Sequence, residues 1–64
     1  MTHEDMLRDY TRCYKNMLSA SAQRRLEELD AEAAREGLCF HMTNEAQWML
    51  PHFIGDPHFE LIPA

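Results

Sequence analysis

The sequence predicts a single small domain, residues 1–64, of mainly α class. We expect a helical hairpin over about residues 3–18 and 20–36, followed by a small α+β or irregular C-terminal cap over residues 38–62. Three observations predict this fold. A chain of 64 residues suffices for one domain only. Apolar residues recur at helical spacing through its first half. After Gly37 the pattern changes to short alternating runs bounded by turn residues.

The first predicted helix begins after Thr2, whose hydroxyl can accept a hydrogen bond at the position of Asp5, as in a capping box. Apolar residues then follow at helical spacing: Met6, Leu7, Tyr10, Cys13 or Tyr14, Met17 and Leu18. The opposite face carries polar residues that we expect to lie in solvent: Arg8, Asp9, Arg12, Lys15 and Asn16. This arrangement is typical of an amphipathic helix with one buried face.

Ser19 or Ser21 can cap the second predicted helix, and Gly37 suits a left-handed C-terminal cap. Its apolar stripe is narrow and rich in alanine, which favours close approach of another helix: Ala22, Leu26, Leu29 and Ala33. One uninterrupted helix is the alternative, because neither Gly nor Pro separates the two segments. Such a helix would be ~50 Å long, and the rest of the chain could not cover it. We therefore favour the hairpin.

The cap is predicted to contain two short strands and a short helix. Residues 38–42 alternate in polarity, with Cys39 and His41 on one face, and residues 58–62 form a second candidate strand. Thr43 or Asn44 can cap a helix over 44–50, which Pro51 ends. Paired strands need a helix beneath them. We therefore expect apolar residues of the strands to face the helices: Phe40, Phe59 and Leu61 against Leu7, Tyr10, Leu26 and Leu29.

Charge and composition exclude several classes of function. The net charge is −5, and no Lys or Arg follows Arg35, so we expect no nucleic-acid binding. The acidic start of the chain is unlike a signal peptide, and no apolar run approaches the ~18 residues of a membrane span. Two cysteines allow at most one disulfide, which is fewer than a disulfide-rich secreted protein contains. These features predict a cytoplasmic protein with reduced thiols and no membrane partner.

The sequence also holds weak candidates for a metal site: Cys39, His41, His52 and His58. These residue types bind zinc, but their spacing matches no zinc pattern. Neither a nucleophile–base arrangement nor a glycine-rich phosphate loop is present in the sequence. We therefore predict that the chain is not an enzyme and carries no cofactor. A small metal-binding or pH-responsive module that uses the four candidates is the alternative.

The predicted helix over 44–50 indicates a partner-binding surface. A helical wheel places Trp48 with Glu45 and His52 on the polar side, away from Met49 and Phe53. A large aromatic residue on a polar face is typical of an interface. The alternative is that Pro51 distorts the segment and turns Trp48 into the core.

These observations together predict a non-catalytic regulator or inhibitor that binds a larger intracellular protein. Phage and bacterial genomes encode many short acidic helical proteins that act by occluding a larger protein, and this chain is similar to them in size and composition, although no motif is shared. We also expect a homodimer, because one small chain cannot cover all of its apolar surface. A structural subunit of a larger assembly is a further alternative.

Overall fold

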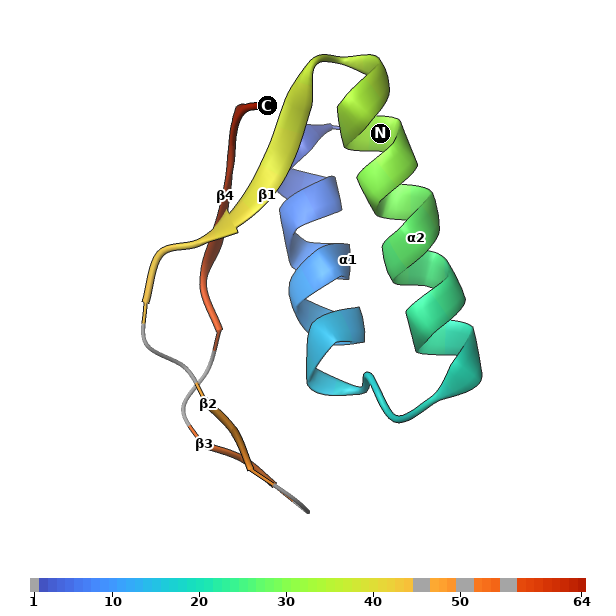
Figure 1. Cartoon of the computed structure of the whole chain (residues 1–64), viewed down its shortest axis with the longest axis vertical. Helices are drawn as coiled ribbons and strands as arrows, with labels where there is room; N and C mark the ends of the chain where they lie inside the picture. Colours follow the sequence, from blue (N-terminus) through green and yellow to red (C-terminus); the bar gives the residue numbers. More distant parts are fainter. Residues whose placement is uncertain (1, 45–46, 50–51, 55–56) are drawn as a thin grey trace.

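The structure of the chain is a computed structural model. It describes residues 2–44, 47–49, 52–54 and 57–64, and for 47–49 and 52–54 it describes the backbone alone. These ranges contain two helices and four strands: α1 His3–Lys15, α2 Ala20–Arg35, β1 Leu38–Met42, β2 Gln47–Met49, β3 His52–Ile54 and β4 Phe59–Pro63. The helices form a hairpin, and a two-stranded sheet of β1 and β4 packs against them, which gives two layers (Figure 1). The predicted fold class is confirmed, and the single long helix is excluded.

The helices begin and end where local side chains satisfy their terminal backbone groups. The hydroxyl of Thr2 accepts a hydrogen bond from the Asp5 amide at 3.1 Å, as the sequence predicted. Helix α1 ends at Lys15 rather than at residue 18, because Asn16 leaves the helical conformation and caps the last turn. Ser19 then accepts from the backbone amide at position 22 and caps α2.

The chain leaves α2 through Gly37, which has a φ of +73°. This left-handed conformation favours glycine because a Cβ atom would crowd the backbone. The carbonyl oxygen of Gly37 also accepts a hydrogen bond from the amide of Ala64 at 3.0 Å. One turn therefore both starts the sheet and holds the C-terminus beside it.

Strands β1 and β4 pair antiparallel, with Phe40 opposite Leu61 and His41 opposite Glu60. The first strand has the predicted bounds, whereas the second spans 59–63 rather than 58–62 and includes Pro63 at its end. Phe40 is half-buried and its neighbours along the strand are exposed, so one face of the sheet covers the helices.

The core lies between the two helices and this inner face. Its fully buried members are joined by half-buried residues of the sheet and of α1: Met6, Leu29 and Ala33 with Tyr10, Leu38, Phe40 and Leu61. The ring of Tyr10 stacks on Phe40 at a centroid distance of 3.9 Å. Phe59 meets Tyr10 edge-on at 4.8 Å and Tyr14 at 5.1 Å. The predicted contact between the aromatic residues of the strands and the helices is confirmed.

The predicted helix over 44–50 is wrong. Strand β2 pairs antiparallel with β3, with Trp48 opposite Phe53 and Met49 opposite His52. A short apolar run satisfies helical and extended patterns equally well, and pairing with a neighbouring segment decides between them. The residue before a proline is also biased toward extended conformations. This second sheet projects from the end of the molecule that lies opposite both termini (Figure 1).

Candidate functional site

We call the paired residues 47–49 and 52–54 the hairpin arm, and the two helices with β1 and β4 the body. In the described residues, β2 and β3 pair only with each other and pack chiefly on each other. The outer edge of each strand therefore presents backbone groups without a strand partner there. An isolated two-stranded hairpin is marginally stable in water and needs further strands or a helix beneath it. The hairpin arm thus needs a surface to cover it.

The hairpin arm carries no full charge. Residues 46–55 contain no Asp, Glu, Lys or Arg, although the chain has a net charge of −5. The arm itself contributes four large apolar residues: Trp48, Met49, Phe53 and Ile54. Depletion of charge together with aromatic residues and methionine is the composition of an interface centre.

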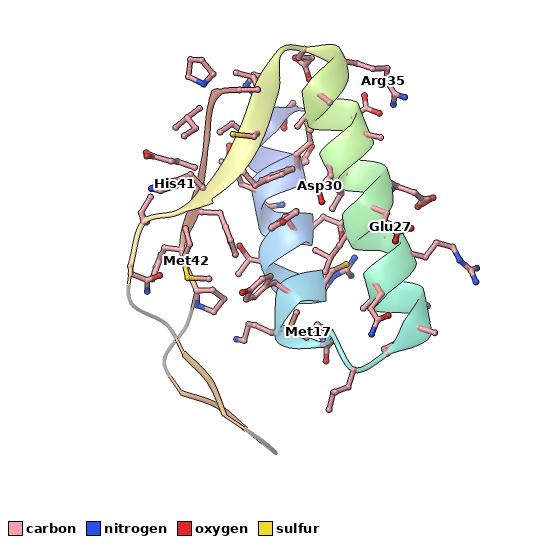
Figure 2. All side chains as sticks on the ribbon, in the orientation of Figure 1. Met17, Glu27, Asp30, Arg35, His41 and Met42 are labelled. Atoms are coloured by element: carbon pink, nitrogen blue, oxygen red, sulfur yellow. The ribbon has the colours of Figure 1, made fainter. Side chains whose placement is uncertain are left out.

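The connection between α1 and α2 lies at the same end of the molecule as the hairpin arm (Figure 1). Leu18 in this connection has 68% of its surface exposed, the highest value for a large apolar residue whose side chain is described. Met17 beside it is half-buried (Figure 2). The sequence placed both residues on the buried face of a longer first helix. The early end of α1 at Lys15 leaves them in the turn instead.

Charges are segregated along the helical hairpin. No acidic residue occurs between Asp9 and Glu27, although the sequence there contains Arg12, Lys15, Arg24 and Arg25. The acidic residues of the helices concentrate toward the other end of the helical hairpin, where α1 begins and α2 ends. His3 and Glu36 are linked there at 3.0 Å between Nε2 and Oε1. The charged helix residues nearest to Leu18 in the sequence are therefore basic, but Arg12 and Arg25 both pair with Asp9.

Asp9 holds the two helices together rather than lying in solvent as predicted. Only 12% of its side chain is exposed, and its Oδ2 accepts a hydrogen bond from Arg25 Nε of α2 at 2.7 Å. Arg12 donates to its other oxygen. Burial alone would raise the pKa of Asp9, but the two guanidinium groups outweigh it and hold the pKa below its ordinary value. The sequence could not show this pair, because it depends on the register of α2 against α1.

Cys13 behaves as the small buried hydrophobe that the sequence predicted. It is 6% exposed, and burial, followed by the charge of Asp9, raises the pKa of its thiol. A raised pKa keeps the thiol protonated at neutral pH, whereas a nucleophile or metal ligand must be a thiolate. Cys13 is therefore a structural residue.

The weak metal candidates are only partly brought together. Cys39 and His41 lie on the outer, exposed face of β1, and His41 points away from the helices (Figure 2). Glu60 of β4 lies opposite His41 on the ladder. His58 is exposed just before β4 and accepts a hydrogen bond from Thr43 through its carbonyl. Even so, the described residues contain no group of three His, Cys, Asp or Glu side chains that could hold a metal ion. The side chain of His52 lies outside the described part.

Two open hollows mark the described surface. The larger, of about 540 Å³, runs along α2, and the smaller, of about 390 Å³, lies at the connection between the helices. Charged residues of the larger hollow pair with one another, as Arg25 does with Glu28 at 3.5 Å and Arg35 with Glu32. Such self-paired charges suit a solvated helix surface.

The predicted partner-binding residues take a different arrangement from the one the helical wheel gave. On the ladder, Trp48 is opposite Phe53 and His52 is opposite Met49. The register therefore groups the position of Trp48 with Phe53 and not with His52, whereas the helical wheel grouped it with His52. The side chains of Trp48 and His52, and the whole of Glu45, lie outside the described part. The partner-binding segment stays a prediction, and its predicted helical arrangement is wrong.

Comparisons with known proteins do not name a function. No protein-family model, no curated protein and no solved structure matches the chain. In the part of the chain that the structure describes, no helix is long and apolar enough to cross a membrane. Function must therefore be argued from the surface itself.

Proposed function

We propose that this chain is a non-catalytic protein-binding module that regulates or inhibits a larger intracellular protein. One observation carries the proposal: an uncharged, apolar hairpin arm stands off a body that has its own core. A folded body gives such an arm a fixed base, and burial of its large residues against a partner removes apolar area from water.

The proposed contact surface comprises the hairpin arm, with Trp48 and His52, the flanking Glu45, and the exposed Leu18 at the same end of the molecule. Interface centres are depleted in charged residues and enriched in aromatic residues and methionine. We therefore expect the partner to offer an apolar surface to the hairpin arm.

Affinity capture from the native host lysate, followed by mass spectrometry, tests this proposal. We expect a protein that is retained by the unchanged chain and lost by Trp48→Ala, with circular dichroism showing that the variant stays folded. Truncation of a central interface residue typically costs ~2 kcal/mol or more, which is about a thirtyfold loss of affinity.

Glu27→Ala is the matched control, because Glu27 is exposed on α2 (Figure 2) and lies outside the proposed surface. It should retain the captured protein at unchanged affinity. Capture that survives Trp48→Ala, or that Glu27→Ala abolishes, would contradict the proposed surface.

A further inference from the structure

We propose that the outer edge of β1 binds an extended segment of another protein, and that this segment carries a lysine or arginine that pairs with Asp30. The added segment is the third strand of the sheet of the body. Within the described residues this sheet has two strands, so each strand has one edge without a strand partner. Extended peptides bind at such edges, where main-chain hydrogen bonds supply affinity and side-chain contacts supply specificity.

The hydrogen bonds at the two ends of the ladder show which backbone groups point outward. The amide of Thr43 donates to the carbonyl of His58 at 2.8 Å, and the amide of Ala64 donates to the carbonyl of Gly37 at 3.0 Å. Successive residues of an antiparallel strand point alternately toward the neighbouring strand and away from it. With the observed register, the backbone groups of three residues of β1 therefore point to its outer edge: Leu38, Phe40 and Met42.

The outer edge of β4 is obstructed, whereas that of β1 is open. Pro63 occupies an outward-pointing position of β4 and has no N–H to donate. Proline and charged side chains on an edge strand are common means of preventing strand pairing. The five residues of β1 include no proline and no Asp, Glu, Lys or Arg. Of the two edges of this sheet, that of β1 is therefore the one suited to an added strand.

An added strand would also cover apolar surface that the body leaves partly open. Leu38, Phe40 and Met42 are half-buried. Phe40 stacks on Tyr10 of α1 at a centroid distance of 3.9 Å, and Tyr10 is half-buried as well. A small sheet is stable with three or more strands and an apolar face, or when it packs against a helix. A third strand would give the body both.

Asp30 supplies the charge that selects the occupant. It is turned toward α1 and β1 (Figure 2), and the hydroxyl of Tyr10 donates a hydrogen bond to its carboxylate. Glu28 and Glu32 of the same helix pair with arginines, whereas no cationic side chain among the described residues pairs with Asp30. Because opposite charges across an interface select the partner, a lysine or arginine of the added strand fits this position.

The same charge argues against a second copy as the occupant. The extended part of this chain follows Gly37, and residues 36–64 contain no Lys or Arg. A strand from a second copy would therefore bring no cation to Asp30. The edge of β1 also belongs to a different sheet from the hairpin arm, so the inference does not rest on the proposed function. Capture through Trp48 and binding at β1 can each fail without the other.

A display library of short random peptides, selected on the immobilised full chain, tests the inference. We expect the enriched peptides to carry Lys or Arg in a stretch without proline. Amide hydrogen exchange of the unchanged chain with one enriched peptide should then show new protection at Leu38, Phe40 and Met42. The amides of Cys39 and His41 point toward β4 and should change little.

Two pairs of variants separate the backbone edge from the charge. Met42→Pro removes one outward N–H and should weaken peptide binding about tenfold, whereas Met42→Val keeps the N–H and should bind like the unchanged chain. Asp30→Asn should weaken binding roughly twofold to fivefold, the size of a partly exposed ion pair. Glu28→Gln is its control on the same helix, because Glu28 already pairs with Arg25. Circular dichroism shows which variants stay folded.

The inference is overturned if no peptide is enriched, if the enriched peptides lack Lys and Arg, or if the new protection falls outside β1. Equal binding to Met42→Pro and Met42→Val would overturn the backbone contact. Equal binding to Asp30→Asn and Glu28→Gln would overturn the choice of a basic occupant. Because hydrogen exchange is measured on the unchanged chain, a variant that fails to fold leaves the test in force.

Discussion

The body and the hairpin arm both carry apolar surface, but they differ in how much of it the chain covers by itself. The body closes two layers on themselves, with Met6, Leu29 and Ala33 between the helices and the sheet. The hairpin arm has two strands and, among the described residues, no second layer. The difference teaches that apolar composition alone does not make a core. A core requires a second layer at the right distance.

The two helices of the body pack against each other through small residues and an ion pair. Ala22 and Ala33 are buried on α2, and Asp9 of α1 reaches Arg25 across the same boundary. Aromatic stacking of Tyr10 on Phe40 then joins α1 to the sheet. The arm carries residues as large as those of the core, but its sequence position takes it beyond the end of the helices (Figure 1).

The largest effect on the body is expected from Leu29→Ala. Leu29 is 1% exposed and belongs to the central cluster. Truncation of a buried leucine costs about 2–5 kcal/mol, which is close to the whole stability of ~3–5 kcal/mol expected for a domain of this size. Denaturant titration followed by circular dichroism should show the variant largely unfolded.

Glu28→Ala is the neighbouring control for this change. Glu28 has 57% of its side chain exposed and pairs with Arg25 at 3.5 Å. Exposed ion pairs contribute about 0–1 kcal/mol, so the midpoint should hardly move. Equal and small effects of the two changes would mean that α2 does not pack on the rest of the body.

A smaller effect, dependent on pH, is expected from Asp9→Asn. The charged hydrogen bond to Arg25 contributes about 1.5 kcal/mol, and the partial exposure of Arg25 keeps the value at this lower end. The pKa of Asp9 is lowered in the folded chain, so its contribution is complete above the unfolded value of ~3.9 and is lost as the pH falls through the folded value.

The free energy of unfolding of the unchanged chain and of Asp9→Asn, measured between neutral pH and strong acid, checks this prediction. The difference should be full at neutral pH and should shrink below about pH 4. A difference that stays constant with pH would show that the charge of Asp9 does not stabilise the body.

Gly37→Ala should destabilise the body by about 1 kcal/mol, the cost of a left-handed conformation for a residue with a Cβ atom. Beyond Gly37 and its two chain neighbours, a Cβ atom at this position meets no atom within 4 Å, so the strain comes from the local backbone conformation at φ +73°. Thermal unfolding measures the effect. Gly37→Asn, which tolerates this conformation better, should lose less, and an order in which Asn costs more than Ala would contradict this explanation.

Much of the body could be predicted from the sequence because its signals are local. The side chains of Thr2 and Ser19 cap the starts of the two helices, and Gly37 follows the end of α2 in a conformation that favours glycine. Residues 38–42 alternate clearly enough to give the bounds of β1 and the face that covers the helices. Contacts between segments that are distant in the sequence could not be predicted in the same way. Asp9 reads as a solvated residue of α1 until the register of α2 is known.

The segment around Trp48 stays a predicted binding site, but the helix that the sequence predicted for it is wrong. The sequence singled out the segment around Trp48 because a helical wheel placed this large aromatic residue on a polar face. A capping signal at Asn44 and a run of only a few apolar residues then favoured a helix, whereas the structure pairs β2 with β3. Pairing is decided between segments, and a three-residue strand is too short for its own periodicity to indicate it.

The independence of the body from the hairpin arm is the central claim, and replacement of residues 46–55 by a short Gly-Ser linker tests it most directly. The thermal unfolding of this shortened chain should match that of the unchanged chain to within ~0.5 kcal/mol, because closing a shorter loop changes the entropy only slightly. The shortened chain should also lose the captured partner. A shortened chain that unfolds would show that the arm belongs to the core of the body, and one that still captures the partner would show that the contact lies elsewhere.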